Sequence, residues 1–145
     1  MTFQFTLQKV LDVKEYEKNE AQVAYRDAMM NFEKVATQLY ELLKQKEVLL
    51  SSYEDKLVQG LPIAFIQQTQ KSLEYLQREI DRLQVQTQNA RALMNERERR
   101  LTVTAVDVKK YEKMKERKLE IYLLDQREKE NKFVDEISVQ QYLKK

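Results

Sequence analysis

The chain has 145 residues but only one glycine, Gly60, and one proline, Pro62, so it offers little of the punctuation that strands and tight turns require. Charged residues make up 34% of the sequence, and Glu, Lys, Gln, Leu and Arg dominate, a composition typical of long helices and coiled coils. The 26 basic and 24 acidic side chains leave a net charge of only +2, which excludes a strong field of the whole molecule toward nucleic acid or anionic lipid.

A heptad pattern predicts a first helix over about residues 5–58. From Leu7 to Lys56, fifteen positions alternate in steps of four and three residues, and eleven of them are apolar. This 3.5-residue period, kept for seven heptads, predicts a helix supercoiled on a partner, because a straight helix would drift off the contact line by about 20° per heptad. The a positions are Leu11, Lys18, Tyr25, Phe32, Leu39, Lys46 and Tyr53, and the d positions are Leu7, Lys14, Ala21, Ala28, Val35, Leu42, Leu49 and Lys56.

A turn at residues 59–62 and a second helix over about 63–140 follow. Glycine just past one helix end and proline at the start of the next is the asymmetry that helix capping prefers. Ten of the fourteen seam positions in the second register are apolar. The a positions are Ile66, Leu73, Ile80, Thr87, Met94, Leu101 and Val108, and the d positions are Thr69, Leu76, Leu83, Ala90, Arg97, Thr104 and Tyr111.

The short connection predicts an all-α fold, one antiparallel coiled-coil hairpin over residues 1–145 in which residue i lies opposite position 122 minus i. The second helix should be the longer one, about 115 Å against about 80 Å at 1.5 Å per residue. Its seam becomes polar at Lys115 and Lys118, so we expect the pairing to end near Tyr111 and the last two dozen residues to lack an intramolecular partner.

Catalytic equipment is missing from the sequence. It has no histidine, no cysteine and no glycine-rich phosphate loop, so acid and base chemistry would fall on carboxylates alone. A bare hairpin offers no enclosed pocket in which to perturb their pKa values. We therefore expect no enzyme, no cofactor and no metal.

The lack of cysteine also fits a reducing compartment. No apolar run approaches the about 18 residues that span a bilayer, and the first residues do not have the order of a signal peptide. These features predict a cytoplasmic protein, soluble or peripheral, without direct membrane insertion.

A basic segment covers residues 109–118, with six basic and two acidic side chains. It is open to three interpretations. A solvated helix face needs no partner. Nucleic-acid binding of the basic-zipper type would require a cleaner positive face and a parallel dimer, so no nucleic-acid partner is expected. An acidic protein partner would be steered by such a charge at the end of the paired region.

An apolar cluster follows the basic segment and surrounds the helix where no partner is left. An exposed apolar cluster usually marks an interface. The alternative is that Phe3 and Phe5 fold over part of it. The cluster consists of Leu119, Ile121, Tyr122, Leu123 and Leu124.

A second apolar surface is expected toward the turn. Side chains repeat at the e position of the first helix, and Tyr40 stands beside them at a b position. The stripe broadens the core edge, but a two-helix hairpin cannot bury a face much wider than its a/d seam, so the surplus is a candidate docking surface. The e-position residues are Met29, Ala36, Leu43, Leu50 and Leu57.

Residues at both ends and the central Gly-x-Pro turn resemble the flagellar FliJ family over the whole chain. The matching residues near the start are Phe5, Leu7, Val10, Leu11, Lys14, Glu17, Glu20, Ala21 and Ala24. Those near the end are Lys110, Glu112, Lys113, Met114, Arg117, Arg127, Glu128, Lys132, Asp135 and Glu136.

The resemblance implies a cytoplasmic component of the bacterial flagellar type III export apparatus, at the cytoplasmic face of the cell membrane, whose coiled coil is similar to the central stalk of rotary ATPases. It implies three partners: the hexameric flagellar export ATPase, whose pore receives the paired termini, a membrane export gate protein, and export chaperones.

We combine this resemblance with the two surfaces as docking hypotheses. The residues expected to meet the ATPase ring are Lys110, Lys113, Arg117, Lys118, Leu119, Ile121, Leu123 and Arg127. Those expected to meet the export gate are Tyr40, Leu43 and Leu50. Two alternatives remain: a structural homodimer in which Gly60 and Pro62 only kink a continuous helix, and a holdase chaperone for exported subunits.

Overall fold

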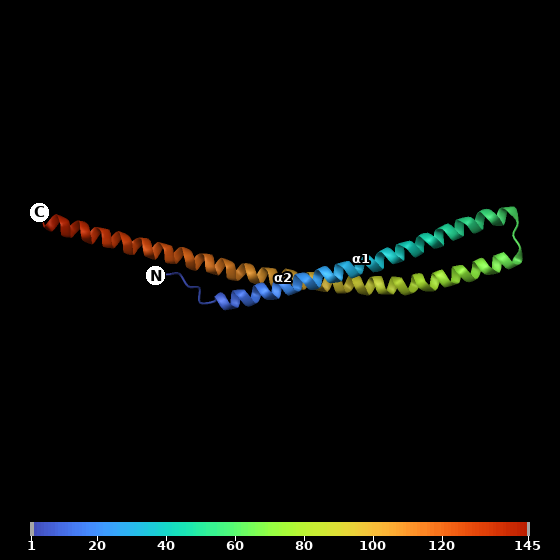
Figure 1. Cartoon of the computed structure of the whole chain (residues 1–145), viewed down its shortest axis with the longest axis horizontal. Coiled ribbons are helices and arrows are strands. Elements are labelled where there is room, and N and C mark those ends of the chain that lie inside the picture. The colour runs from blue at the N-terminus through green and yellow to red at the C-terminus, as the bar shows by residue number, and fades with distance from the viewer. Residues whose placement is uncertain (1, 145) are drawn as a thin grey trace. The chain divides into compact units, whose positions relative to one another are not determined.

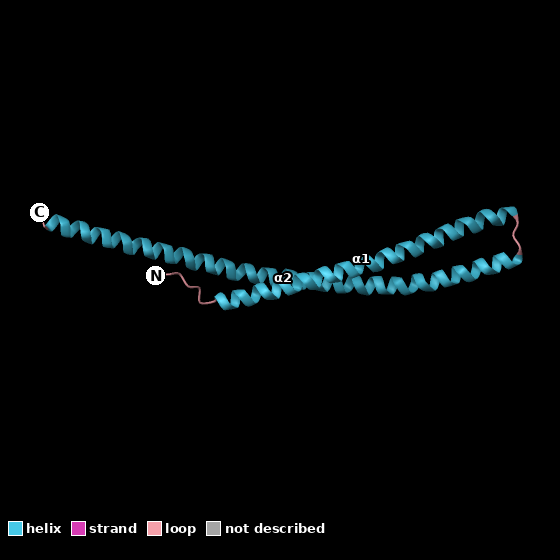
Figure 2. Ribbon diagram, viewed as in Figure 1, coloured by secondary structure: helices cyan, strands magenta, loops and turns pink. Residues whose placement is uncertain are grey.

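Two long helices make up almost the whole chain. The computed structural model describes residues 2–144 and contains α1 (Gln8–Gln59) and α2 (Ile63–Leu143), with no strand among those residues. Figure 1 shows the two helices joined by one short connection, and Figure 2 shows a non-helical segment at the N-terminal end. The predicted all-α antiparallel coiled-coil hairpin with a longer second helix is confirmed.

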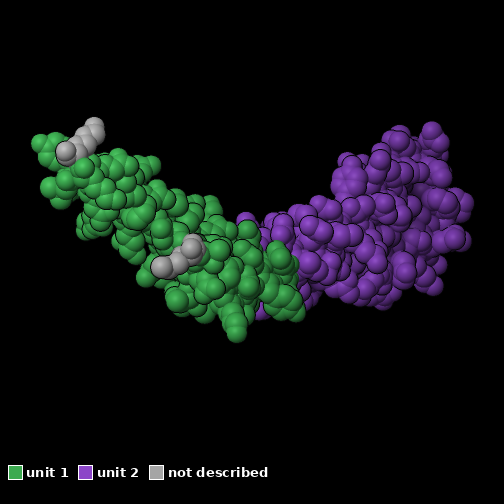
Figure 3. Space-filling model, turned by 60° about the vertical axis from the view of Figure 1, so that its left-hand side comes forward, with its two compact units in different colours: residues 1–20, 102–145 green, residues 21–101 purple. Residues whose placement is uncertain are grey.

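The chain divides into two compact units, and each contains parts of both helices. Unit 1 comprises residues 1–20 and 102–145 within the described range, and unit 2 comprises residues 21–101 (Figure 3).

Unit 2 is a two-helix hairpin whose core is a single line of side chains. Every predicted seam position in it is buried or half-buried except Lys56, which is exposed. Ile80 has the smallest exposure, at 1%. The thin core follows from the architecture, because two helices can bury only the faces that they turn toward each other. The buried apolar residues of unit 2 are Ala21, Ala28, Ile80, Leu83 and Ala90.

Cross-helix contacts in unit 2 fix the register. Lys46 Nζ donates a hydrogen bond to Gln77 Oε1. The guanidinium of Arg91 lies 5.5 Å from the centre of the Phe32 ring. Each pair lies within one residue of the predicted pairing of i with 122 minus i, so the two heptad patterns meet as expected.

Threonines occupy seam positions because their hydroxyls bond within α2. Thr69 Oγ1 donates to the Phe65 carbonyl at 2.9 Å, and Thr87 Oγ1 donates to the Leu83 carbonyl at 2.6 Å. A buried hydroxyl without a partner would cost free energy, and the carbonyl four residues earlier removes that cost without help from α1.

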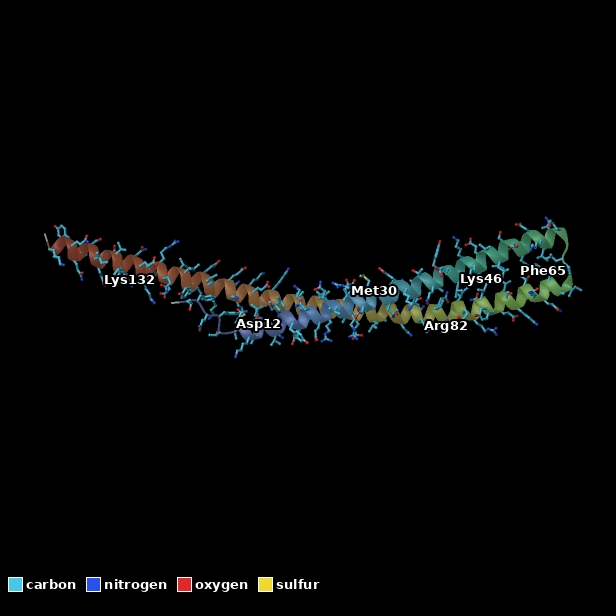
Figure 4. The ribbon with its side chains drawn as sticks, viewed as in Figure 1. Asp12, Met30, Lys46, Phe65, Arg82 and Lys132 are labelled. Carbon is cyan, nitrogen blue, oxygen red and sulfur yellow. The ribbon has the colours of Figure 1, made fainter. Side chains whose placement is uncertain are left out.

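The turn that joins the helices depends on its glycine. Gly60 has φ +86°, in the left-handed region that L side chains rarely adopt, and its N–H bonds to the Leu57 carbonyl at 3.3 Å. Pro62 precedes α2, and its carbonyl accepts from the N–H groups of Phe65 and Ile66 at 3.1 and 3.3 Å. The Lys56 ammonium lies 4.8 Å from the centre of the Phe65 ring, which adds a contact across the turn. Figure 4 labels Phe65 near the turn.

Unit 1 pairs the start of the chain with the second half of α2. The expected helix start at Phe5 is wrong, because α1 begins at Gln8, whose N–H bonds to the Phe5 carbonyl at 3.0 Å. Outside the helix, Phe5 can turn inward: it is 8% exposed and forms a buried cluster with Leu11 and Val108. The side chains packed against this cluster are Phe3, Leu7 and Tyr111.

The N-terminal segment of unit 1 reaches further along α2 than α1 does. The Phe3 ring lies 5.5 Å from the Tyr122 ring, so the non-helical N-terminal segment covers α2 beyond Tyr111. This contact comes from the segment before α1, so it matches the alternative in which an N-terminal phenylalanine covers part of the apolar cluster. From residue 127 to residue 144 every side chain is exposed.

Candidate functional site

The basic segment lies on α2 in unit 1, where the N-terminal part of the chain packs. Lys110, Lys113, Arg117 and Lys118 are all exposed. Lys115 is half-buried, and it lines a hollow of about 700 Å³ with residues 3–6, Gln8 and Lys9. The four exposed cations stand at positions i, i+3, i+7 and i+8, so they share one broad face of the helix. A partner that lies along this face could therefore meet all four positive charges.

The apolar cluster is exposed except on the side that faces the N-terminal segment. Tyr122 is half-buried beside Phe3. The alternative in which the N-terminal phenylalanines cover part of the cluster thus holds for Tyr122, whereas Phe5 is directed to Leu11 and Val108. The other members remain open to solvent: Leu119 at 38%, Ile121 at 65%, Leu123 at 56% and Leu124 at 60% exposure.

Arg127 lies just beyond the cluster and is exposed. With Glu120, Leu123 and Leu124 it lines a shallow hollow of about 300 Å³ on one helix. Asp125 and Lys129 form the ion pair that their four-residue spacing predicts, at 3.2 Å. The label of Lys132 in Figure 4 shows where this C-terminal part of α2 lies. This part combines apolar contact area with charges held on a regular helix.

The tip surface, formed by Tyr40, Leu43 and Leu50 in unit 2, is partly open. Tyr40 is 65% exposed and Leu43 is 42% exposed, whereas Leu50 is half-buried. Farther from the turn, Met29 and Ala36 at the same e position are also half-buried. The apolar e stripe is therefore exposed at Leu43 and Leu57 but half-buried at Leu50 between them.

Two features near the turn were missed by the sequence-based analysis. A groove of about 670 Å³ lies on α1 at the g side, opposite the e stripe, where Val48, Leu49 and Leu76 give it an apolar floor. Moreover, residues 57–70 carry no charge, and Val58 and Ile63 are 89% and 75% exposed. The signal for the second feature was the uncharged run between Lys56 and Lys71.

A carboxylate shifts the pKa of one tyrosine in unit 1. The Tyr16 hydroxyl donates a hydrogen bond to Glu20 Oε1 at 2.7 Å, and this bond to a carboxylate, with its negative charge, raises the pKa of Tyr16 above its usual value. Within residues 2–144 no group of three or more metal-binding side chains comes together. Among the same residues, no helix is long and apolar enough to cross a membrane.

The fold defines a class: an antiparallel coiled-coil hairpin of two long helices that leaves apolar and basic side chains exposed. The model of the family described as Flagellar FliJ protein matches residues 3–145. The chain is also 34% identical over 143 residues to the Flagellar FliJ protein of Bacillus subtilis (strain 168), with 99% of this chain and 97% of that protein covered.

The chain belongs to the flagellar FliJ family. Membership supports a role as a component of flagellar protein export, in a family whose members act without catalysis. No solved structure matches the chain.

Proposed function

We propose that the chain is a stalk of the flagellar export apparatus and that the basic segment and apolar cluster of α2 dock into the hexameric export ATPase. One observation carries this proposal: exposed cations stand directly before exposed apolar side chains on a helix that is fully open from residue 127 onward. Charge steers an encounter, and desolvated apolar contacts hold it.

The docking is divided between two kinds of side chain. Lys110, Lys113, Arg117 and Lys118 meet acidic side chains or backbone carbonyls of the ring, and Arg127 adds a second positive point beyond the cluster. The apolar side chains Leu119, Ile121 and Leu123 bury against the ring. Because a supercoiled rod is stiff and presents different faces around its axis, one stalk can act unequally on six ATPase subunits and favour ring assembly.

ATPase stimulation tests the ring proposal. Lys113, Arg117 and Lys118 are replaced together by Glu, which should abolish stimulation and weaken binding in a salt-dependent way. The matched control replaces Arg26, Lys34 and Lys71 by Glu, because these cations are also exposed but lie outside the proposed site. Unchanged stimulation by the first variant, or equal loss with the control, would refute docking through the basic segment.

The tip surface is proposed to bind the export gate at the cell membrane. Tyr40 and Leu43 supply exposed apolar area, and Leu50 continues it along the same side of α1. The double substitution Leu43→Asp with Leu50→Asp should abolish gate binding, and Tyr40→Ala, which removes an exposed ring only, should weaken it. The control is Val48→Asp, which places the same charge at an exposed position on the other side. Retained binding by the double variant with normal helicity would contradict this assignment.

A further inference from the structure

A second apolar stripe runs along the C-terminal arm, defined as residues 119–143 of α2. Six residues of the arm follow steps of four, three, four, three and four, the spacing of a coiled-coil seam. This stripe is not the predicted seam of the second helix, which continues from Tyr111 to Lys115 and Lys118. Its residues are Leu119, Leu123, Gln126, Glu130, Phe133 and Ile137.

The apolar members of this stripe are open to solvent. Leu119 and Ile137 are each 38% exposed, Leu123 is 56% exposed and Phe133 is 64% exposed. Two apolar residues, two polar residues and two apolar residues follow one another, so the order reads the same in both directions. A stripe of this kind is complementary to itself when a second identical helix runs antiparallel to it.

We propose that the C-terminal arm pairs antiparallel with the same arm of a second copy of this chain, with residue i opposite position 256 minus i. Leu119 then meets Ile137 of the second copy, and Leu123 meets Phe133 of the second copy. Gln126 meets Glu130 of the second copy at the centre, where the amide donates to the carboxylate. The twofold axis repeats each of these contacts once.

The polar centre explains why a second copy fits this stripe better than an arbitrary apolar helix. A partner that is apolar throughout would bury Gln126 and Glu130 without hydrogen bonds, which is unfavourable. A polar pair at one point of a coiled coil also fixes register and orientation at a cost in stability. Residues 119–137 carry six acidic and three basic side chains, so two arms repel each other and the pair should be weak and strengthened by salt.

The pairing has a consequence for docking, and this consequence alone rests on the proposed function. Leu119 and Leu123 belong both to the stripe and to the surface proposed to meet the ATPase ring. A chain that is paired through its arm therefore cannot present these two side chains to the ring. Self-pairing would keep unassembled chains from exposing the apolar arm and would be released when the ring binds.

Sedimentation equilibrium of the full-length chain tests the pairing without any ATPase. The mass should rise with concentration from 17.5 kDa toward twice that value, and more steeply at high salt. Phe133→Glu with Ile137→Glu should keep the chain at 17.5 kDa throughout. The control, Leu124→Glu with Val139→Glu, replaces two exposed apolar residues off the stripe and should behave like the unaltered chain. A monomer at every concentration, or equal loss in the control, overturns the proposal.

Disulfide formation tests the orientation, because the chain has no cysteine of its own. In the antiparallel pair, a chain with Gln126→Cys mixed with a chain with Glu130→Cys should cross-link several-fold faster than either variant with itself. Faster cross-linking of each variant with itself would show a parallel pair and overturn the assignment. Because both measurements use this chain alone, failure of ring docking and failure of self-pairing are separately visible.

Discussion

Removal of most of the Ile80 side chain should destabilise unit 2 more than any comparable change on its outer face. Ile80 is 1% exposed at an a position, so Ile80→Ala takes three buried carbons out of the seam. At about 0.8 kcal/mol per buried carbon, the loss of burial is about 2.4 kcal/mol. The residual cavity adds to this value, and the better helix propensity of alanine subtracts a few tenths of a kcal/mol. We expect a net loss of about 2–3 kcal/mol.

The control for this change is Val85→Ala on the same helix. Val85 is 57% exposed, so its replacement carries a similar gain in helix propensity but little loss of burial, and we expect less than about 0.5 kcal/mol. Urea denaturation followed by circular dichroism at constant m-value gives both free energies of unfolding. If Ile80→Ala lowers the free energy of unfolding no more than Val85→Ala does, Ile80 does not lie in the seam and the predicted register is wrong.

Three further perturbations test other parts of the structure. Gly60→Ala should lower the free energy of unfolding by about 1–2 kcal/mol, wholly from backbone conformation because nothing lies within 4 Å of the added Cβ, and no change in the urea midpoint would contradict the left-handed turn. Phe5→Ala should lower the local free energy of unfolding of unit 1 by about 3 kcal/mol and speed amide hydrogen exchange around Leu11 and Val108. Unchanged exchange would show that the N-terminal segment does not stabilise unit 1. Glu20→Gln should lower the pKa of Tyr16 in a spectroscopic titration, because the Glu20 carboxylate favours the neutral phenol, and an identical titration would refute this pairing. The raised pKa of Tyr16 also implies a contribution to the folding stability that is fully present below the pKa of the unfolded state and is lost as pH rises through the pKa of the folded state.

The helices, the seam and the turn could be predicted because each depends on local rules. A 3.5-residue period, kept over many turns, leaves one arrangement for an antiparallel partner, and Gly60 with Pro62 gives a single place to reverse. From Leu7 to Lys56 and from Ile66 to Tyr111, all predicted seam positions except Lys56 are buried or half-buried. Lys56 is the exception because its ammonium lies on the Phe65 ring beside the turn, where an aromatic face substitutes for burial.

The N-terminal segment could not be predicted from periodicity. Residues 2–7 precede α1, and their packing on α2 follows no repeat, so neither the ring contact of Phe3 with Tyr122 nor the burial of Phe5 has a heptad signal. For the candidate docking residues, the sequence gives the type of side chain but not its exposure. The sequence identifies apolar side chains on α2 and at the tip surface, but only coordinates show that Leu50 is half-buried while Tyr40 is open. The identity of a docking partner depends on surfaces of another molecule.

One distance tests most directly whether the two heptad patterns pair within a single chain. Spin labels on Lys44→Cys and Arg78→Cys occupy exposed outer positions directly opposite each other in the predicted register. Helices packed 8–10 Å apart place such labels about 25 Å from each other, and an excess of unlabelled chain should leave this value unchanged. If Gly60 and Pro62 only kinked a continuous helix, the labels would lie about 50 Å apart. The account predicts the shorter distance, and the longer one would contradict it.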